Sequence, residues 1–115
     1  MDIIKVAGNS RTSAVAGAIA GVFREYQKAE VQAIGAGAVN QAVKALVLAT
    51  SYLEKDGYQI AFIPKFLDVD IDGKIRTAIK IFVVHHLGPA AEEAPESELN
   101  LPDDAWGDPE ASAGH

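Results

Sequence analysis

The segment AIGAGAVNQAVK, residues 33–44, contains the change of pattern that decides the fold. Strand-like residues from Glu30 end at Gly35, a two-glycine turn follows, and a helical pattern starts near Ala38 and runs to about Leu53. The apolar spacing of this helix predicts one buried face. Its expected members are Val39, Ala42, Val43, Leu46, Ala49, Thr50 and Leu53. A strand, a glycine turn and an amphipathic helix in this order predict an α/β domain.

The residues before this segment predict a second strand–helix pair. An apolar strand at residues 3–6 ends at Gly8, and a helical pattern begins at Ala14. The polar run at residues 9–13 offers side chains that suit a helix N-cap. The helix is rich in alanine and glycine, which indicates close packing, because each glycine otherwise costs about 1 kcal/mol of helix propensity.

The residues after the segment predict two more strands. Residues 58–67 alternate as a strand, residues 68–73 form a hairpin tip with the turn signal Asp72-Gly73, and residues 74–84 form a long last strand. Ile75, Ile79 and Ile81 share one face of that last strand, and Arg76 and Lys80 share the other. The predicted element order is therefore β-α-β-α-β-β.

Length and composition indicate one globular domain. The chain has 115 residues, of which 49% are hydrophobic and 23% charged. It contains no cysteine, which excludes disulfides and thiolate chemistry. There is no apolar run of the ~18 residues that cross a bilayer, and the N-terminus lacks the pattern of a signal peptide. We therefore expect a cytoplasmic protein that does not associate with membranes.

The charge of the chain is divided unevenly. The net charge is -6, yet residues 1–90 hold ten Lys and Arg and eight Asp and Glu, whereas residues 91–115 hold eight Asp and Glu and no Lys or Arg. We predict a mildly basic domain at residues 1–88 and an acidic, mostly disordered tail at residues 89–115. The apolar residues Leu99, Leu101 and Trp106 are the part of the tail expected to dock on the domain or on a protein partner.

Several stretches of the chain resemble the stage V sporulation protein S family. They are IKVAG at residues 4–8, SAVAGA at 13–18, VQAIGAGAVNQAVKA at 31–45, DIDG at 70–73 and RTAIK at 76–80. The resemblance covers about residues 2–85, and that family looks like a bacterial branch of the Alba superfamily. It implies an Alba-like α+β two-layer sandwich with two helices on a four-stranded mixed sheet. It also implies a homodimer that binds DNA or RNA and acts in sporulation or developmental regulation.

The resemblance also implies which residues bind nucleic acid. In Alba proteins these lie in the loop after the first strand, at the start of the second helix and on a pair of hairpin arms. The corresponding positions are Asn9, Ser10, Arg11, Gly35, Gly37, Asn40, Gln41, Lys44, Lys65, Lys74, Arg76 and Lys80. Archaeal Alba proteins have lysines in the first loop and arginines before the second helix. This chain has Asn9-Ser10-Arg11 and two glycines there, which predicts weak, salt-sensitive binding.

The glycine turn has two interpretations from the residues alone. Either the two glycines only form a tight turn, or the backbone N–H groups of the turn bind an anion at the helix N-terminus. Asn40 occupies the position where a dinucleotide fingerprint needs its third glycine, so we expect no nucleotide cofactor.

Amides at Asn40 and Gln41 suit base edges or phosphates, and Lys44 suits phosphate; an ordinary solvated or dimer-facing helix surface is the alternative. The cations of the hairpin likewise belong to a nucleic-acid-binding arm or to an ordinary solvent face.

No pattern in the chain predicts catalysis or a metal site. The acidic run at residues 68–73 resembles a calcium loop, but Ile79 stands where that loop needs its twelfth-position glutamate. His85 and His86 point to opposite sides of a strand end, and the hydroxyls near Ser10 have no base beside them. We expect no cofactor, no metal and no enzymatic activity. Because the second helix stripe is wider than one sheet covers, we expect a homodimer.

Two functions follow from these observations. The first is a nucleic-acid-binding regulator whose acidic tail competes with DNA or RNA for the basic face. The second is a protein-interaction or scaffold module of the same fold, favoured by the small basic excess and the acidic hairpin tip. The sequence alone leaves both open.

Overall fold

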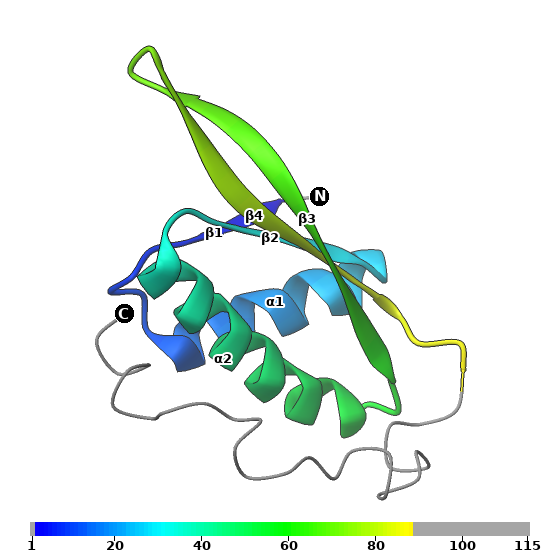
Figure 1. Cartoon of the computed structure of the whole chain (residues 1–115). Coiled ribbons are helices and arrows are strands. Elements are labelled where there is room, and N and C mark those ends of the chain that lie inside the picture. The colour runs from blue at the N-terminus through cyan, green and yellow to red at the C-terminus, as the bar shows by residue number, and fades with distance from the viewer. Residues whose placement is uncertain (1, 89–115) are drawn as a thin grey trace, which may run out of the picture.

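The computed structural model describes residues 2–88, so the predicted acidic tail lies outside the described residues. The elements follow the predicted order, as Figure 1 shows. They are β1 (Ile3–Val6), α1 (Thr12–Tyr26), β2 (Ala29–Ala33), α2 (Ala36–Glu54), β3 (Ile60–Ile71) and β4 (Lys74–His85). Neither helix is long and apolar enough to cross a membrane.

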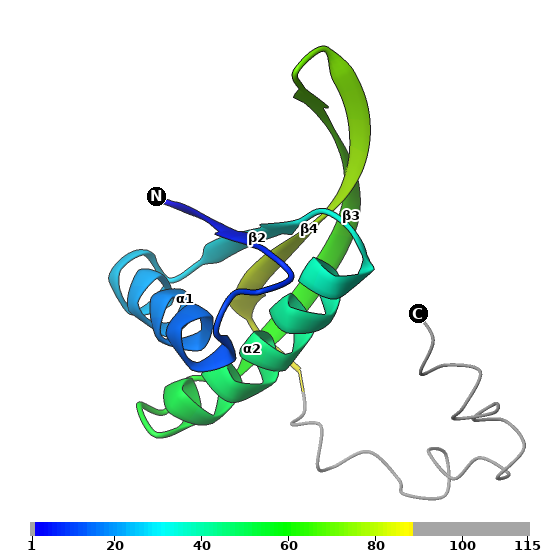
Figure 2. The same ribbon diagram turned by 90° about the vertical axis from the view of Figure 1, so that its left-hand side faces the viewer.

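The four strands form one mixed sheet in the order β1-β2-β4-β3. β1 pairs with β2 in parallel, and β4 pairs with both β2 and β3 in antiparallel. Both helices lie on the same side of this sheet (Figure 2), with α2 on the side of β3 and β4. The predicted α+β two-layer sandwich of two helices on a four-stranded mixed sheet is confirmed. We call the side of the sheet without helices the open face.

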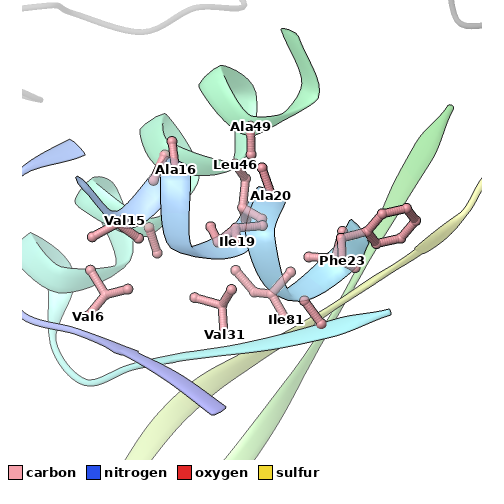
Figure 3. Close-up of a cluster of buried hydrophobic side chains, with 14 of the residues drawn as sticks. Val6, Val15, Ala16, Ile19, Ala20, Phe23, Val31, Leu46, Ala49 and Ile81 are labelled. Carbon is pink, nitrogen blue, oxygen red and sulfur yellow. The ribbon is translucent and has the colours of Figure 1, made fainter. Parts of the chain in front are cut away.

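The core lies between the helices and the sheet (Figure 3). Its largest fully buried side chains are Phe23, Ile19, Leu53, Val31 and Val83. Alternate residues of β2 are buried, which gives this central strand a helix-side face and a polar face.

The helices pack on each other through alanines. Ala16 and Ala20 of α1 and Ala45 and Ala49 of α2 are all 0% exposed. The prediction that the glycines of α1 serve close packing is wrong, because a Cβ at Gly17 or Gly21 would meet no atom within 4 Å.

The buried stripe of α2 is rotated around the helix relative to the prediction. Val43 is 47% exposed instead of buried, and Val47, one turn later, is 62% exposed. Ala38 and Ala45, which the predicted stripe left out, are buried. The reason is that α1 and the sheet cover one side of α2 only, so the flank that points away from α1 has no cover within the described residues.

The N-cap of α1 also differs from the prediction. Arg11 occupies that position and makes no side-chain capping hydrogen bond. The hydroxyl of Ser10 instead accepts the N–H of Ala7 at 2.9 Å, which closes the turn after β1. The polar run therefore shapes the loop and does not cap the helix.

The β3–β4 hairpin is longer than predicted. Residues 68–71, expected in the tip, continue β3 and pair in register with residues 74–77. The turn consists of Asp72 and Gly73 alone, with φ of 53° and 81°. Positive φ at both central residues is the type I′ hairpin geometry that Asp-Gly favours. The predicted turn signal is confirmed. Because β2 pairs only with residues 79–83 of β4, residues 67–78 project beyond the sheet as a hairpin arm.

Gly35 and Gly37 play different conformational roles at the start of α2. Gly35 is the N-cap, with φ 89° and ψ 156°, a region that L-residues with a side chain rarely adopt. A Cβ at Gly37 would lie 3.7 Å from the Cα of Gly8, an ordinary contact. Backbone conformation therefore requires glycine at residue 35 and not at residue 37.

We predict that Gly35→Ala lowers the free energy of unfolding by about 1–3 kcal/mol, because alanine is strained at this φ and ψ. The matched control is Gly37→Ala, which we expect to change stability by less than about 1 kcal/mol, since it adds helix propensity and makes no close contact. Urea denaturation followed by circular dichroism measures both. Equal losses in the two variants would contradict the assignment.

Candidate nucleic-acid interface

The loop after β1 and the start of α2 form one surface. A Cβ at Gly8 would lie 3.8 Å from the backbone N of Ala38, so the two backbones approach closely. The turn before α1 is held by the N–H of Ser10, which donates to the carbonyl of Ala7 at 3.0 Å. Two segments that the sequence separates by more than a helix are therefore adjacent in space.

Gln41 connects these two segments. Its Nε2 donates to the carbonyl oxygen of Ser10 at 2.7 Å and approaches the hydroxyl of Thr12 at 3.4 Å. The sequence grouped Gln41 with Asn40 and Lys44 as candidate contact residues, but its amide points toward the start of α1. Its position makes it a residue that fixes the loop against α2.

Asn40 and Lys44 lie one turn apart on the outer surface of α2, and both are exposed. Asn9 and Arg11 are exposed in the neighbouring loop. The first turn of α2 has no acidic residue, and its N-cap glycine offers no side-chain acceptor. The backbone N–H groups there point outward without a side-chain partner, which is the arrangement that suits an anion.

The four predicted cations of the hairpin share one side of the sheet. Lys65 pairs directly with Lys80, and the alternation of β4 places Lys74 and Arg76 on the same side. Ile81 and Val83, at the positions between, face the helices and are buried. The cations therefore lie on the open face and its extension along the hairpin arm.

A groove of about 600 Å³ separates the two halves of the predicted site. One wall comes from the loop after β1 and the end of β2, through Ala7, Gly8 and Ile34. The other wall is the hairpin arm, through Val69, Ile71 and Ala78, and Lys5 and Gln32 also line the groove. Because Arg76 pairs with Val69 and Lys74 pairs with Ile71, these cations flank the groove. The loop after β1 and the hairpin arm therefore line one groove, whereas no residue of α2 is part of its lining.

Sequence reasoning missed Lys5 and Gln32. The register aligns Lys5 with Gln32, Gln32 with Lys80, and Lys80 with Lys65. These four residues form a line across the whole sheet on the open face, which we call the basic row. The alternation within each strand indicated that these side chains face away from the core, but no local signal shows which strands are neighbours.

The acidic residues of the arm limit the side from which an anion approaches. Asp70 lines the groove, and its carboxylate accepts the N–H of Gly73 at 2.9 Å. Asp68 accepts the hydroxyl of Thr77 at 3.4 Å. These carboxylates place negative charge near the tip, so phosphate is favoured at the Lys5 end of the groove.

The side chain of His85 contacts other residues of the domain. Its Nε2 lies 2.8 Å from Oε1 of Gln27, and its ring centroid lies 5.0 Å from that of Phe23. Gln27 also donates to the hydroxyl of Tyr58 at 3.2 Å. Residues 2–88 contain no group of three side chains arranged to hold a metal ion.

The chain matches a known protein family and is similar to solved structures. The family model for stage V sporulation protein S matches residues 2–86, which confirms the resemblance inferred from the sequence. Alba from Thermoplasma volcanium is 20% identical, and the match covers 73% of this chain and all of that chain with a TM-score of 0.48.

The adjacent amides Asn40 and Gln41 provide a matched test of this geometry. We predict that Gln41→Ala lowers the free energy of unfolding by about 1 kcal/mol, because the carbonyl of Ser10 loses its partner. Asn40→Ala removes an exposed side chain and is expected to change stability by less than about 0.5 kcal/mol. Thermal and urea unfolding measure the difference, and similar losses in both variants would show that Gln41 does not join the loop to α2.

Proposed function

This chain belongs to the stage V sporulation protein S family, and from that premise we propose that it is a nucleic-acid-binding regulator that acts as a homodimer. Its role lies in sporulation or developmental regulation, in the cytoplasm. The binding surface comprises the loop after β1, the start of α2 and the cations of the hairpin.

The observation that carries the proposal is that the loop after β1 and the hairpin arm line one groove, while the start of α2 lies against the same loop at Gly8. These segments carry the exposed cations Arg11, Lys44, Lys74 and Arg76. Among residues 2–88 none of these four cations forms an ion pair, since the recorded pair joins Arg24 to Asp56. Their charges are therefore available for phosphate groups.

The charge balance sets the kind of binding. Residues 1–90 have only two more basic than acidic residues, and contacts to phosphate release counterions, so affinity falls as salt rises. The proposed binding is therefore modest, salt-dependent and of little sequence specificity.

The homodimer is supported by an uncovered apolar surface, which we call the apolar flank. It consists of Val43 and Val47 of α2 and Phe62 and Phe66 of β3. Phe62 pairs with Val83 and Phe66 with Ile79, so both phenylalanines lie on the helix side of the sheet. Figure 2 shows α2 beside this part of the sheet with no element beyond it. Large exposed side chains on a helix and a neighbouring strand suit a second copy related by a two-fold axis.

We predict that the full chain binds DNA or RNA in a fluorescence polarisation titration at about 50 mM salt and loses at least tenfold in affinity at about 200 mM. The double variant Lys44→Ala/Arg76→Ala should weaken binding and reduce the salt dependence. Lys55→Ala, at the far end of α2, is the control with one charge removed elsewhere. Absence of binding at about 50 mM salt would reject the proposal and favour the scaffold function.

We predict that the wild-type protein has a molar mass in solution of twice the 12.1 kDa of one chain. Val47→Lys should reduce this mass to that of the monomer, because burying an unpaired charge in an apolar interface is costly. Ile3→Lys is the matched control, since Ile3 is 45% exposed and lies on the open face. Analytical ultracentrifugation reads out both. A monomeric wild type, or an unchanged mass for Val47→Lys, would reject this interface.

A further inference from the structure

The basic row crosses all four strands of the open face. Neighbouring strands lie about 4.8 Å apart, so its two ends, Lys5 and Lys65, are separated by about 14 Å. Gln32 and Lys80 occupy the two central positions. The row thus presents three ammonium groups and one amide in a line on a surface that the helices do not cover.

The row concentrates positive charge from three lysines on the open face. Lys65 and Lys80 stand directly opposite each other, an arrangement of like charges that destabilises a sheet. None of its three lysines forms an ion pair in the described part of the chain. Glu30 is the carboxylate of β2 on this face, and it accepts the amide of Gln32 at 2.6 Å. An anionic ligand along the row would relieve the repulsion.

An aromatic ring lies beside the row. Phe82 follows Lys80 on the same face of β4 and is half-buried. The Nζ atoms of Lys80 and Lys65 lie 5.2 and 6.0 Å from its ring centroid. A ring flanked by cations is the combination on which unpaired bases stack while their phosphates are neutralised.

The groove continues this surface. Lys5 and Gln32 belong to the row and also line the groove, whose arm-side wall is formed by Val69, Ile71 and Ala78. Its volume of about 600 Å³ falls within the range of pockets that enclose small organic ligands. A base that is not stacked in a duplex fits such an apolar wall, whereas duplex bases are held in their stack.

We infer that the open face binds a single-stranded nucleic-acid segment, with phosphates along Lys5, Lys80 and Lys65 and bases against Phe82 and in the groove. This inference rests on the proposed function and adds its substrate class, which is unpaired rather than duplex nucleic acid. It also adds Lys5, Gln32 and Phe82 to the binding surface.

The test compares four proteins, the wild type, Lys5→Ala, Phe82→Leu and Lys55→Ala, each as the full chain. Each is titrated with a labelled single strand of about 16 nucleotides, as RNA and as DNA, and with the matching duplex. Lys5→Ala should weaken single-strand binding about fivefold at ~50 mM salt. It should also reduce the steepness with which the logarithm of the binding constant falls with the logarithm of salt concentration, by about 0.7. Phe82→Leu should weaken it at least about fivefold. Lys55→Ala should stay within about twofold of wild type, because the same charge is removed away from the open face.

The outcomes separate this inference from the proposed function. Selective loss of single-strand affinity in Lys5→Ala and Phe82→Leu supports it. If wild type binds but Lys5→Ala and Phe82→Leu behave like Lys55→Ala, or if duplex is the preferred ligand, the inference is overturned while the proposed function stands. If wild type binds neither form, both fail. If circular dichroism shows that Lys5→Ala is not folded, Lys65→Ala, on the other edge of the sheet, takes its place in the test.

Discussion

β2 is hydrogen-bonded on both sides, to β1 in parallel and to β4 in antiparallel, and the register of these two pairings constrains the rest of the structure. Ala29, Val31 and Ala33 face the helices and are buried, so Glu30 and Gln32 must face the other way. A shift of one residue would bring polar side chains into the core and is therefore strongly disfavoured. The same register aligns Lys5, Gln32 and Lys80 on the open face. The requirement to bury three small apolar residues of β2 thus determines where the cations lie.

The two sides of the sheet consequently have different surfaces. On the helix side, α1 and α2 pack against each other through buried alanines. Val43 and Val47 lie on the flank of α2 that points away from α1, and both are exposed. On the open face, the basic row and the half-buried Phe82 lie among exposed apolar residues such as Ile3 and Ile63. The edge strand β3 contributes to both sides, because it supplies Phe62 and Phe66 to the helix side and Lys65 to the open face. The proposed association of two chains and the proposed contact with nucleic acid would therefore use opposite sides of β3.

Much of the fold follows from local patterns, and the site follows from them only in part. The strand at residues 3–6, both helices and the Asp72-Gly73 turn were predicted because periodicity and turn chemistry act over a few residues. The exposure of Val43 was missed because a helix pattern does not say how far its neighbours extend. Gln41 was grouped with Asn40 and Lys44 because they are near in sequence, yet its amide reaches Ser10 across the packing of two segments. Lys5 and Gln32 were missed because their significance depends on three strands at once.

The sequence by itself determined the order of the elements, the family and the type of the hairpin turn. Each of these depends on the spacing of apolar residues, on the positive φ that glycine permits, or on short stretches of residues read directly. Tertiary structure alone decided that β4 lies between β2 and β3, that the loop after β1 touches the start of α2, and that three lysines from separate strands stand in one row. Strand order and register are set by pairing between residues far apart in the chain, and no single segment contains that information.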